Sequence, residues 1–381
     1  MLRPFAKTPP HESVMRELPA KDNGMTPAEL LTGQELGNGW VVEKVAQRRP
    51  NATGGFFSVG YIAAHADGRK GFLKAVDLTK AMEEKGTDKL KEMQRLISTY
   101  LFEEQLCNKC NHLSRVSRAL ESGSFNQDHE NPFFEVFYLI FELADHDIRA
   151  HFDDQDYFDT VFALKMLHDV AVGISQLHCA DIAHQDLKPS NVLVYRNHGS
   201  KVCDLGRAWD KNSKAPHDEF SIAGDRTYSP PELLYGHIPS AQKARRFGCD
   251  LYHLGNLIVF SFTRVSINSL VAKNLDGPYR PGFWGGSFEE VMPFLQAAFG
   301  EAINEFEEHV PDFLREALST FVQQLCDPNP QNRGHNKNKG LNQFGLERYI
   351  TQFDRLAQKA RLKSVKSRSN SKKDLVNAPV Q

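Results

Sequence analysis

Cysteine is scarce in this chain. Its 381 residues include six cysteines, too few to build a disulfide framework for a protein of this length. We therefore expect a reducing compartment and a cytoplasmic protein. Cys107 and Cys110 have a CxxC spacing, but no second pair accompanies them and they lie in a helical pattern. Packing in the core is the favoured role for both thiols, with metal binding as the alternative.

Long apolar segments and an excess of one charge are also missing. The most apolar stretch, 254–262, is too short to span a bilayer, and the first four residues do not begin an apolar secretory signal. The formal net charge of −2 gives no sign of specific nucleic-acid binding. With 40% hydrophobic and 25% charged residues, and without an internal repeat, the chain is predicted to be globular, with about two to three domains.

One stretch concentrates chemically active side chains. Residues 184–191 read His-Gln-Asp-Leu-Lys-Pro-Ser-Asn, which brings an acid, a base and an amide into one short segment. A long amphipathic segment precedes it and a short apolar run follows it. An Asp-Leu-Gly sequence then begins at Asp204. A solvated polar loop is the ordinary interpretation of such a stretch when it stands alone.

The two segments resemble the catalytic and metal-binding loops of protein kinases, His-Arg-Asp-Leu-x-x-x-Asn followed by Asp-Phe-Gly, with Gln185 and Leu205 as departures. The resemblance covers roughly residues 37–345. It implies an α+β, bilobal, protein-kinase-like fold with a small antiparallel-sheet lobe and a larger, mostly helical lobe. The domains expected are an N-terminal extension with a short capped helix (1–36), the small lobe (37–144), the large lobe (145–345), and a C-terminal helix with a basic, Ser-rich tail (346–381).

The resemblance also implies how the polar groups transfer phosphate from ATP. Asp186 is expected to orient the acceptor hydroxyl and accept its proton, and Lys188 to neutralise charge on the γ-phosphate. Asn191 and Asp204 are the expected Mg²⁺ ligands, since Mg²⁺ prefers oxygen donors. Lys188 is typical of the serine/threonine branch, so protein serines and threonines are the expected acceptors. Asp225 stands where that branch commonly has Thr, and it is placed to pair with Lys188 and alter substrate docking.

The nucleotide side of the expected site comes from the first 144 residues. Lys74, in a strand-like run at 71–77, is predicted to grip the α- and β-phosphates. Glu103, on a helix predicted over 88–110, is preferred to Glu104 as its partner, because the apolar residues that follow fit the kinase pattern better from Glu103. The remaining ATP-binding candidates are the Gly-rich loop residues Gly54, Gly55 and Ser58 and the hinge residues Glu142 and Ala144.

Two departures from the kinase pattern affect the adenine pocket. Gly60 and Phe72 replace a Val and an Ala that clamp adenine in the family. Phe72 is predicted to lie against the adenine plane or the roof of the pocket, with Gly60 making room. Four further residues resemble structural supports. Asp250 is expected to begin a helix and brace the catalytic loop, and Arg333 to pair with Glu232 of Pro-Pro-Glu. His184 is the remaining support.

Hydrophobic patterns predict most of the other elements. We expect strands at 40–45, 136–143, 192–195 and 201–203, a capped helix from 26 to about 31, a helix from 159 or 160 to about 178, and a C-terminal helix after Gly345. Leu90, Met93, Ile97 and Leu101 stand at helical spacing and predict the helix over 88–110. The basic, serine-rich segment 355–373 is predicted to be a solvated, flexible tail. It is a candidate autophosphorylation site or, alternatively, a weak anchor for acidic surfaces.

Two other functions stay open at this stage. One is a small-molecule kinase similar to the aminoglycoside phosphotransferases, which share the Asp and Asn but usually lack the Lys and the Pro-Pro-Glu/Arg pairing. The other is a scaffold that binds nucleotide without catalysis. Retention of Lys74, Asp186, Asn191 and Asp204 argues against the scaffold.

Overall fold

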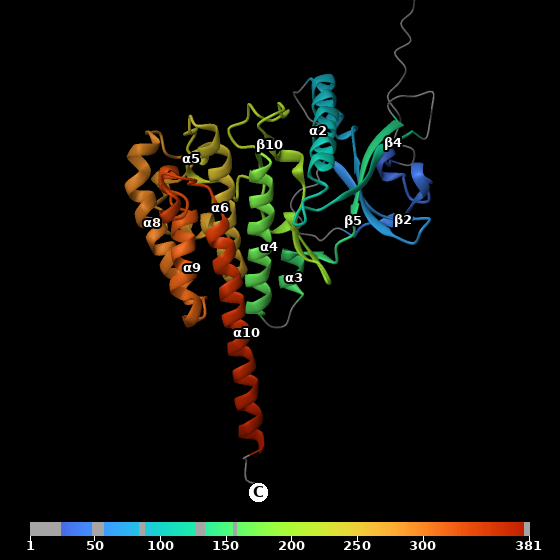
Figure 1. Ribbon diagram of the computed structural model, residues 1–381. Helices are drawn as coiled ribbons and strands as arrows, with labels where there is room; N and C mark the ends of the chain where they lie inside the picture. Colours follow the sequence, from blue (N-terminus) through green and yellow to red (C-terminus); the bar gives the residue numbers. More distant parts are fainter. Residues whose placement is uncertain (1–23, 48–56, 84–87, 127–133, 155–157, 377–381) are drawn as a thin grey trace, which may run out of the picture.

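The computed structural model describes residues 24–47, 57–83, 88–126, 134–154 and 158–376. Figure 1 shows a small lobe built on a twisted sheet beside a larger, mostly helical lobe. The sheet has five antiparallel strands. The α+β, bilobal fold expected from the sequence is therefore confirmed.

The small-lobe sheet has the strand order β1-β2-β3-β5-β4. Side chains alternate between its faces, so Leu73 and Ala75 of β3 are buried on one side while Phe72 and Lys74 point to the other, where helix α2 packs. The strands are β1 (Trp40–Val45), β2 (Ser58–His65), β3 (Lys70–Val76), β4 (Ala119–Asn126) and β5 (Glu135–Glu142).

Helix α2 (Lys89–Cys110) covers one face of the sheet, after the short helix α1 (Lys80–Glu83). The Asp88 carboxylate accepts two free amides at its start and so caps it. The predicted helix is confirmed, and of the four residues at helical spacing Met93 and Ile97 are half-buried, whereas Leu90 and Leu101 are 76% and 50% exposed. Packing against both the sheet and the large lobe selects the buried face, which contains Leu96, Tyr100, Phe102, Glu103, Leu106, Cys107 and Cys110.

The segment before β1 covers the opposite face of the sheet. Ala28, Leu31 and Leu36 join the apolar cluster there, and the Tyr61 hydroxyl donates to the Ala28 carbonyl at 2.6 Å. The capping box predicted at Thr26 is present, but the helix is a single 3₁₀ turn (Pro27–Glu29) rather than a helix to residue 31. Burial of Leu31 in the sheet cluster competes with continuation of the helix.

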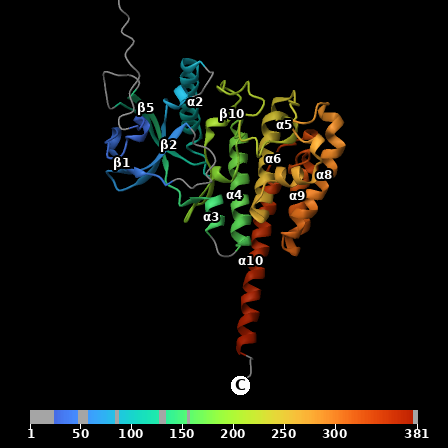
Figure 2. The ribbon, with the colours of Figure 1, turned by 180° about the vertical axis from the view of Figure 1, so that it is seen from behind.

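The large lobe is built around helices α4 and α6, which lie side by side in both views (Figures 1 and 2). The predicted stripe of α4, from Leu164 to Leu177, is fully buried, and Asp159 caps the helix as expected. The helices are α3 (Ile148–Asp153), α4 (Thr160–Cys179), α5 (Pro231–Leu234), α6 (Gln242–Thr263), α7 (Ile267–Asn274), α8 (Phe288–Glu308), α9 (Asp312–Leu325) and α10 (Glu347–Val376).

Short strands in this lobe position the catalytic segment. The hairpin of β8 (Val192–Tyr195) and β9 (Gly199–Val202) lies immediately before Asp204, and β6 (His146–Asp147) pairs with β8. Strand β7 (Ile182–Ala183) pairs with β10 (Trp209–Asp210) and leads directly into His184.

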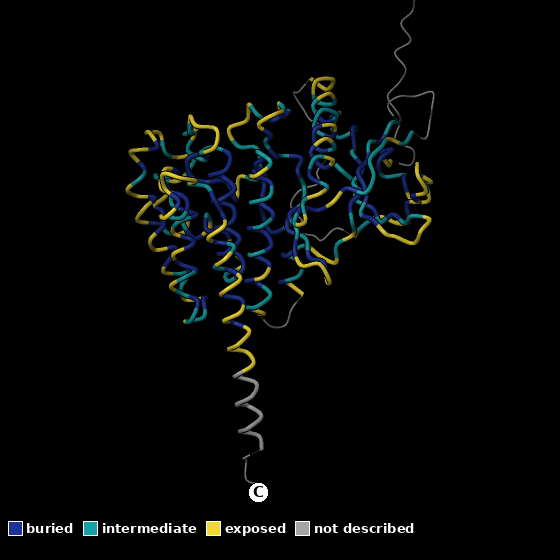
Figure 3. Tube along the Cα trace, viewed as in Figure 1, coloured by how far each residue is buried: buried dark blue, intermediate teal, exposed yellow. Residues whose placement is uncertain are grey.

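Two expectations for the helices of this lobe are wrong. Asp250 does not begin a helix; it lies in the middle of α6, which starts at Gln242. The basic segment after residue 355 is not a loose tail along its backbone, because it continues α10 to Val376. Helix α10 packs along α4. Figure 3 shows buried and exposed positions alternating along its packed part, and exposed positions up to residue 365 where it leaves the lobe.

No single helix of the described residues is long and apolar enough to span a membrane. Helices α6 and α7 have that length and composition only when taken together, and the chain bends by 82° between them.

Candidate active site

Three charged side chains from three elements meet between the lobes. The Lys74 ammonium, on β3, donates to both carboxylate oxygens of Glu103 at 2.9 Å and to Asp204 Oδ1 at 3.1 Å. Glu103 is 4% exposed on α2, whereas the neighbouring Glu104 is half-buried and accepts a hydrogen bond from the Tyr100 hydroxyl at 3.5 Å. The structure thus pairs Lys74 with Glu103 and not with Glu104.

The charges of this trio depend on one another. Burial disfavours the charged ammonium of Lys74, but Asp204 and Glu103 outweigh it and raise the Lys74 pKa. Lys74 in turn lowers the pKa of Asp204 to about 2, against the effect of burial. Burial raises the pKa of Glu103, although Lys74 opposes this shift. Lys74 and Asp204 are therefore charged at neutral pH.

The Asp250 carboxylate holds the backbone of the loop that carries Asp186. Asp250 is fully buried in α6, and its two carboxylate oxygens accept the backbone amides of His184 and Gln185 at 2.8 and 2.7 Å. His178 Nε2 lies 2.9 Å from the same carboxylate. The His184 ring accepts the Asp186 amide at Nδ1 and therefore donates from Nε2 to the Cys203 carbonyl, just before Asp204.

The Asp186 carboxylate is fixed by three donors. Asn191 Nδ2 lies 3.1 Å and Lys188 Nζ also 3.1 Å from Asp186 Oδ2, and the Asp225 amide donates to Oδ1 at 2.8 Å. Gly224 makes this approach possible, because a Cβ there would lie 2.4 Å from the Gln185 carbonyl. Burial raises the pKa of Asp186, while Lys188 opposes the shift.

Asp225 brings a second carboxylate to Lys188. Its Oδ2 lies 3.5 Å from Lys188 Nζ, and its Oδ1 accepts the Thr227 amide. Burial disfavours the Lys188 charge, but Asp186 and Asp225 outweigh it and raise the Lys188 pKa. The ammonium is therefore shared between two carboxylates.

Asn191 and Asp204 suit a magnesium ion by their chemistry. Both offer oxygen donors, and the amide of Cys203, the residue before Asp204, donates to the Asn191 carbonyl at 3.0 Å. The Asp204 side chain is 40% exposed and so accessible to a ligand. Within the described ranges, no cluster of three or more His, Cys, Asp and Glu side chains has a metal-binding arrangement. A site with one carboxylate and one amide is completed by substrate phosphates and water, which is how Mg²⁺ is commonly held.

Of the residues predicted to bind ATP around adenine and the phosphates, the structure describes only some. Gly54 and Gly55 lie outside the described residues, and Ser58 is the first residue of β2. The side chain of Glu142, at the end of β5, pairs with Lys201, its amide donates to the Arg118 carbonyl at 3.1 Å, and its carbonyl accepts from the Tyr195 hydroxyl at 3.4 Å. Ala144, two residues later, is half-buried. Asp147 caps α3 through the Ala150 amide.

Phe72 and Gly60 are neighbours across β2 and β3. A Cβ at Gly60 would lie 2.9 Å from Phe72 Cζ, so the ring occupies the space that a side chain at residue 60 would fill. On the same side of the sheet, Phe72 packs with the cluster that contains Phe141. The ring therefore reshapes the wall of the site above Lys74.

Glu232 and Arg333 form a second buried ion pair in the large lobe. The guanidinium donates to both Glu232 oxygens at 2.5 Å, and both side chains are at most 1% exposed. The pair joins the end of the activation segment, residues 204–232, to the turn after α9.

Some supporting residues were missed by the sequence reasoning. Gln185 Oε1 accepts from Arg246 of α6, and Arg246 Nη2 lies 3.3 Å from Asp218 Oδ1 in the activation segment. His178 supports Asp250, as described above. Neither residue has a local sequence signal, because each finds its partner only when distant segments meet.

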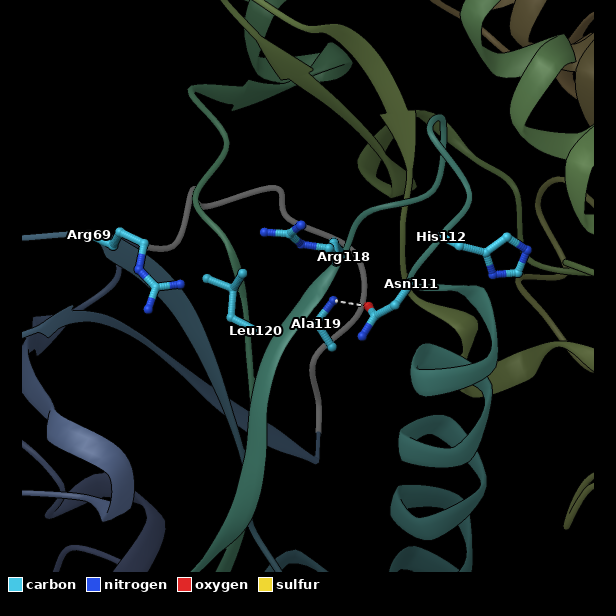
Figure 4. A pocket seen from close by; sticks show the side chains of 6 residues that line it. All are labelled: Arg69, Asn111, His112, Arg118, Ala119 and Leu120. Atoms are coloured by element: carbon cyan, nitrogen blue, oxygen red, sulfur yellow. Dashed lines mark hydrogen bonds between the residues drawn. The ribbon is translucent and has the colours of Figure 1, made fainter. Parts of the chain in front are cut away.

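An open pocket of about 480 Å³ lies at the end of the sheet beside Glu142. Figure 4 shows Arg69 and Arg118 on either side of Leu120, and Asn111 accepting from the Ala119 amide. Its lining contains none of the candidate catalytic residues, so the pocket is separate from the site described above.

Comparison with known proteins agrees with this geometry. The model of the protein kinase domain matches residues 53–339, and the chain belongs to the protein kinase family. It is 26% identical to an Aurora kinase of Debaryomyces hansenii over 83% of this chain and 68% of that protein. It is also 28% identical to the serine/threonine-protein kinase/endoribonuclease IRE1 of Oryza sativa subsp. japonica over 47% of this chain, and 34% identical to mitogen-activated protein kinase 2 of Arabidopsis thaliana over 28%. The matched regions span only 17% and 28% of those last two proteins.

Proposed function

We propose that this protein kinase is catalytically active and transfers the γ-phosphate of Mg-ATP to serine or threonine residues of proteins. The observation that carries the proposal is that two charged groups lie close enough for Asp204 to act electrostatically on Asp186 and Lys188. The groups are Lys74 with Glu103 and Asp204, and Asp186 with Lys188. The first group suits polyphosphate and metal, and the second suits an acceptor hydroxyl.

Each residue then has a role that its contacts support. Lys74, held by Glu103, binds the α- and β-phosphates. Asp186, whose carboxylate is oriented by three donors, positions the hydroxyl and accepts its proton. Lys188 stabilises charge on the transferred phosphoryl group. These roles rely on positioning and electrostatics, which supply most of the catalysis in phosphoryl transfer.

Bound magnesium neutralises phosphate charge in this chemistry. Asp204 and Asn191 are the residues we propose to hold it. Asn191 also donates to Asp186, so the amide links the metal side of the site to the acceptor side. Loss of either residue is expected to weaken metal-dependent nucleotide binding.

The test is transfer of labelled phosphate from ATP to protein substrates, followed by phosphoamino-acid analysis. Asp186→Ala is expected to lower the rate by roughly 10²–10⁴ while the protein remains folded. Glu103→Gln and Glu104→Gln form a matched pair, of which only the first should strongly impair transfer. Wild-type activity in Asp186→Ala would contradict the assignment.

The same assay separates the alternatives. Transfer to an aminoglycoside or sugar panel, without transfer to proteins, would favour a small-molecule kinase. Nucleotide binding without any transfer would favour a scaffold. Phosphotyrosine as the main product would overturn the serine/threonine assignment. The individual protein substrates, a cytoplasmic location and contact of the α10 end with acidic surfaces stay predictions.

A further inference from the structure

An ion pair near its C-terminal end attaches helix α2 to the large lobe. Lys109 Nζ lies 3.0 Å from each carboxylate oxygen of Asp210. Asp210 belongs to β10, which pairs with β7, the strand that leads into His184. The helix that carries Glu103 is thus tied to the strand pair next to the catalytic loop.

Asp210 is the centre of this attachment. Its side chain is 3% exposed, and it also accepts the Asn212 amide and the Ser213 hydroxyl, each at 3.0 Å. Burial acts to raise the Asp210 pKa, but the Asn212 amide, Lys109 and Ser213 outweigh it, so the pKa is lowered and the group is charged. The carboxylate therefore depends on these three donors.

Of the three donors to Asp210, the Ser213 hydroxyl is the one that can be phosphorylated. It is half-buried in the activation segment, in a tight turn closed on Asp210. Two exposed lysines, Lys211 and Lys214, flank it and pair with surface carboxylates. A phosphate on this oxygen replaces a hydroxyl donor by a group with about −1.5 to −2 charges, next to a buried carboxylate.

Lys109 is the cation for which both anions would then compete. Its side chain is 35% exposed, so its ammonium has room to turn outward. A phosphate forms stronger charge-assisted hydrogen bonds than a neutral hydroxyl, whereas Asp210 repels it. Movement of Lys109 to the phosphate would detach the end of α2 from β10.

We propose that Ser213 is an inhibitory phosphorylation site, at which phosphate draws Lys109 away from Asp210 and loosens helix α2. The effect on catalysis rests on the proposed function. In the modifying step the Ser213 oxygen attacks the γ-phosphorus of ATP, the bond to the β-phosphate oxygen breaks, ADP leaves, and the hydroxyl proton passes to a base of the phosphorylating kinase. A modification here lowers activity, in contrast to a phosphate that orders the segment.

The experiment uses full-length protein with phosphoserine incorporated at residue 213 during translation. Initial rates of phosphate transfer to a general protein substrate and hydrogen exchange of the α2 amides are measured side by side. We expect the phosphorylated protein to lose about tenfold or more in kcat/KM and its α2 amides to exchange faster, since loss of a partly buried ion pair is the cause. Ser213→Ala should stay within about twofold of wild type, because Asp210 keeps Lys109 and Asn212.

Two matched variants test whether phosphate acts by drawing Lys109 away from Asp210. Lys109→Met has no cation to redirect, so it should resemble the phosphorylated protein and respond little to phosphoserine at 213. Phosphoserine at the exposed Ser221 should leave both readouts unchanged. If phosphoserine at 213 inhibits Lys109→Met as strongly as it inhibits the wild-type protein, Lys109 is not the group through which it acts and the proposal is wrong. An unchanged or raised rate in the phosphorylated protein would also contradict it.

The two readouts also separate this inference from the proposed function. If unphosphorylated wild-type protein transfers no phosphate to any acceptor, the proposed function fails. Hydrogen exchange still decides the inference in that case. Unchanged exchange of α2 on phosphorylation at 213 would reject the loosening of the helix.

Discussion

Glu232 and Arg333 are joined by two hydrogen bonds at 2.5 Å, although they lie 101 residues apart and are both almost fully buried. Two charges removed from water require nearly complete compensation, and here each supplies it to the other. The stability of the large lobe therefore depends on keeping both partners or removing both.

This leads to a stability prediction. Glu232→Gln leaves the Arg333 charge buried without its counter-ion, and we expect it to lower the free energy of unfolding by about 3–5 kcal/mol. Urea unfolding followed by circular dichroism measures this loss. The surface pair Lys273 and Glu305 provides the control, since Glu305→Gln should cost much less stability than Glu232→Gln. Equal effects of the two substitutions would contradict the role of burial.

A second prediction concerns nucleotide binding. Gly60→Val should place a side chain in the space that Phe72 occupies and obstruct the site, while Phe72→Ala should remove apolar contact with adenine and weaken binding. Titration with a fluorescent ATP analogue gives both dissociation constants. The double variant Gly60→Val with Phe72→Ala should recover part of the affinity, because the smaller side chain makes room for the valine. Unchanged affinity in both single variants would reject the placement of Phe72 against adenine.

The third prediction is that the unphosphorylated enzyme is already competent. Gln185 cannot pair electrostatically with a phosphate, but it accepts from Arg246, whose guanidinium also contacts Asp218. A built-in carboxylate thus anchors the activation segment. Fully dephosphorylated protein should show its full initial rate without a lag, and Asp218→Asn should reduce that rate. A lag that preincubation with ATP removes, and that the substitutions Ser213→Ala, Ser221→Ala and Thr227→Ala abolish, would contradict this prediction.

The fourth prediction concerns pH. His253 is 1% exposed, and burial lowers its pKa to about 4. Because the unfolded-state pKa is near 6.5, its contribution to stability is complete above pH 6.5 and is lost as pH falls toward 4. At pH 5 the free energy of unfolding lost through His253 is about 2 kcal/mol. Comparing urea unfolding at pH 7 and pH 5, we expect His253→Leu to lose less stability on acidification than wild type does; a variant with the wild-type pH dependence would show that another group is responsible.

The sequence determined the elements whose evidence is local. Strand β1 occupies the predicted residues 40–45, and the buried stripe and Asp159 cap of α4 were readable because periodicity and capping act within a few turns. The catalytic segment was recognisable for a similar reason. Asp186, Lys188 and Asn191 are close in the chain, and their spacing is constrained by one loop.

The tertiary structure decided the rest. The buried face of α2 was not readable from its periodicity, because the helix packs against the sheet and the large lobe at once and Leu90 remains outside. Arg246, His178 and Lys109 carried no local signal, since each gains its importance from a carboxylate far along the chain. A sequence specifies such pairs only through the whole fold, because an ion pair depends on distance and burial, and both are fixed when remote elements pack together.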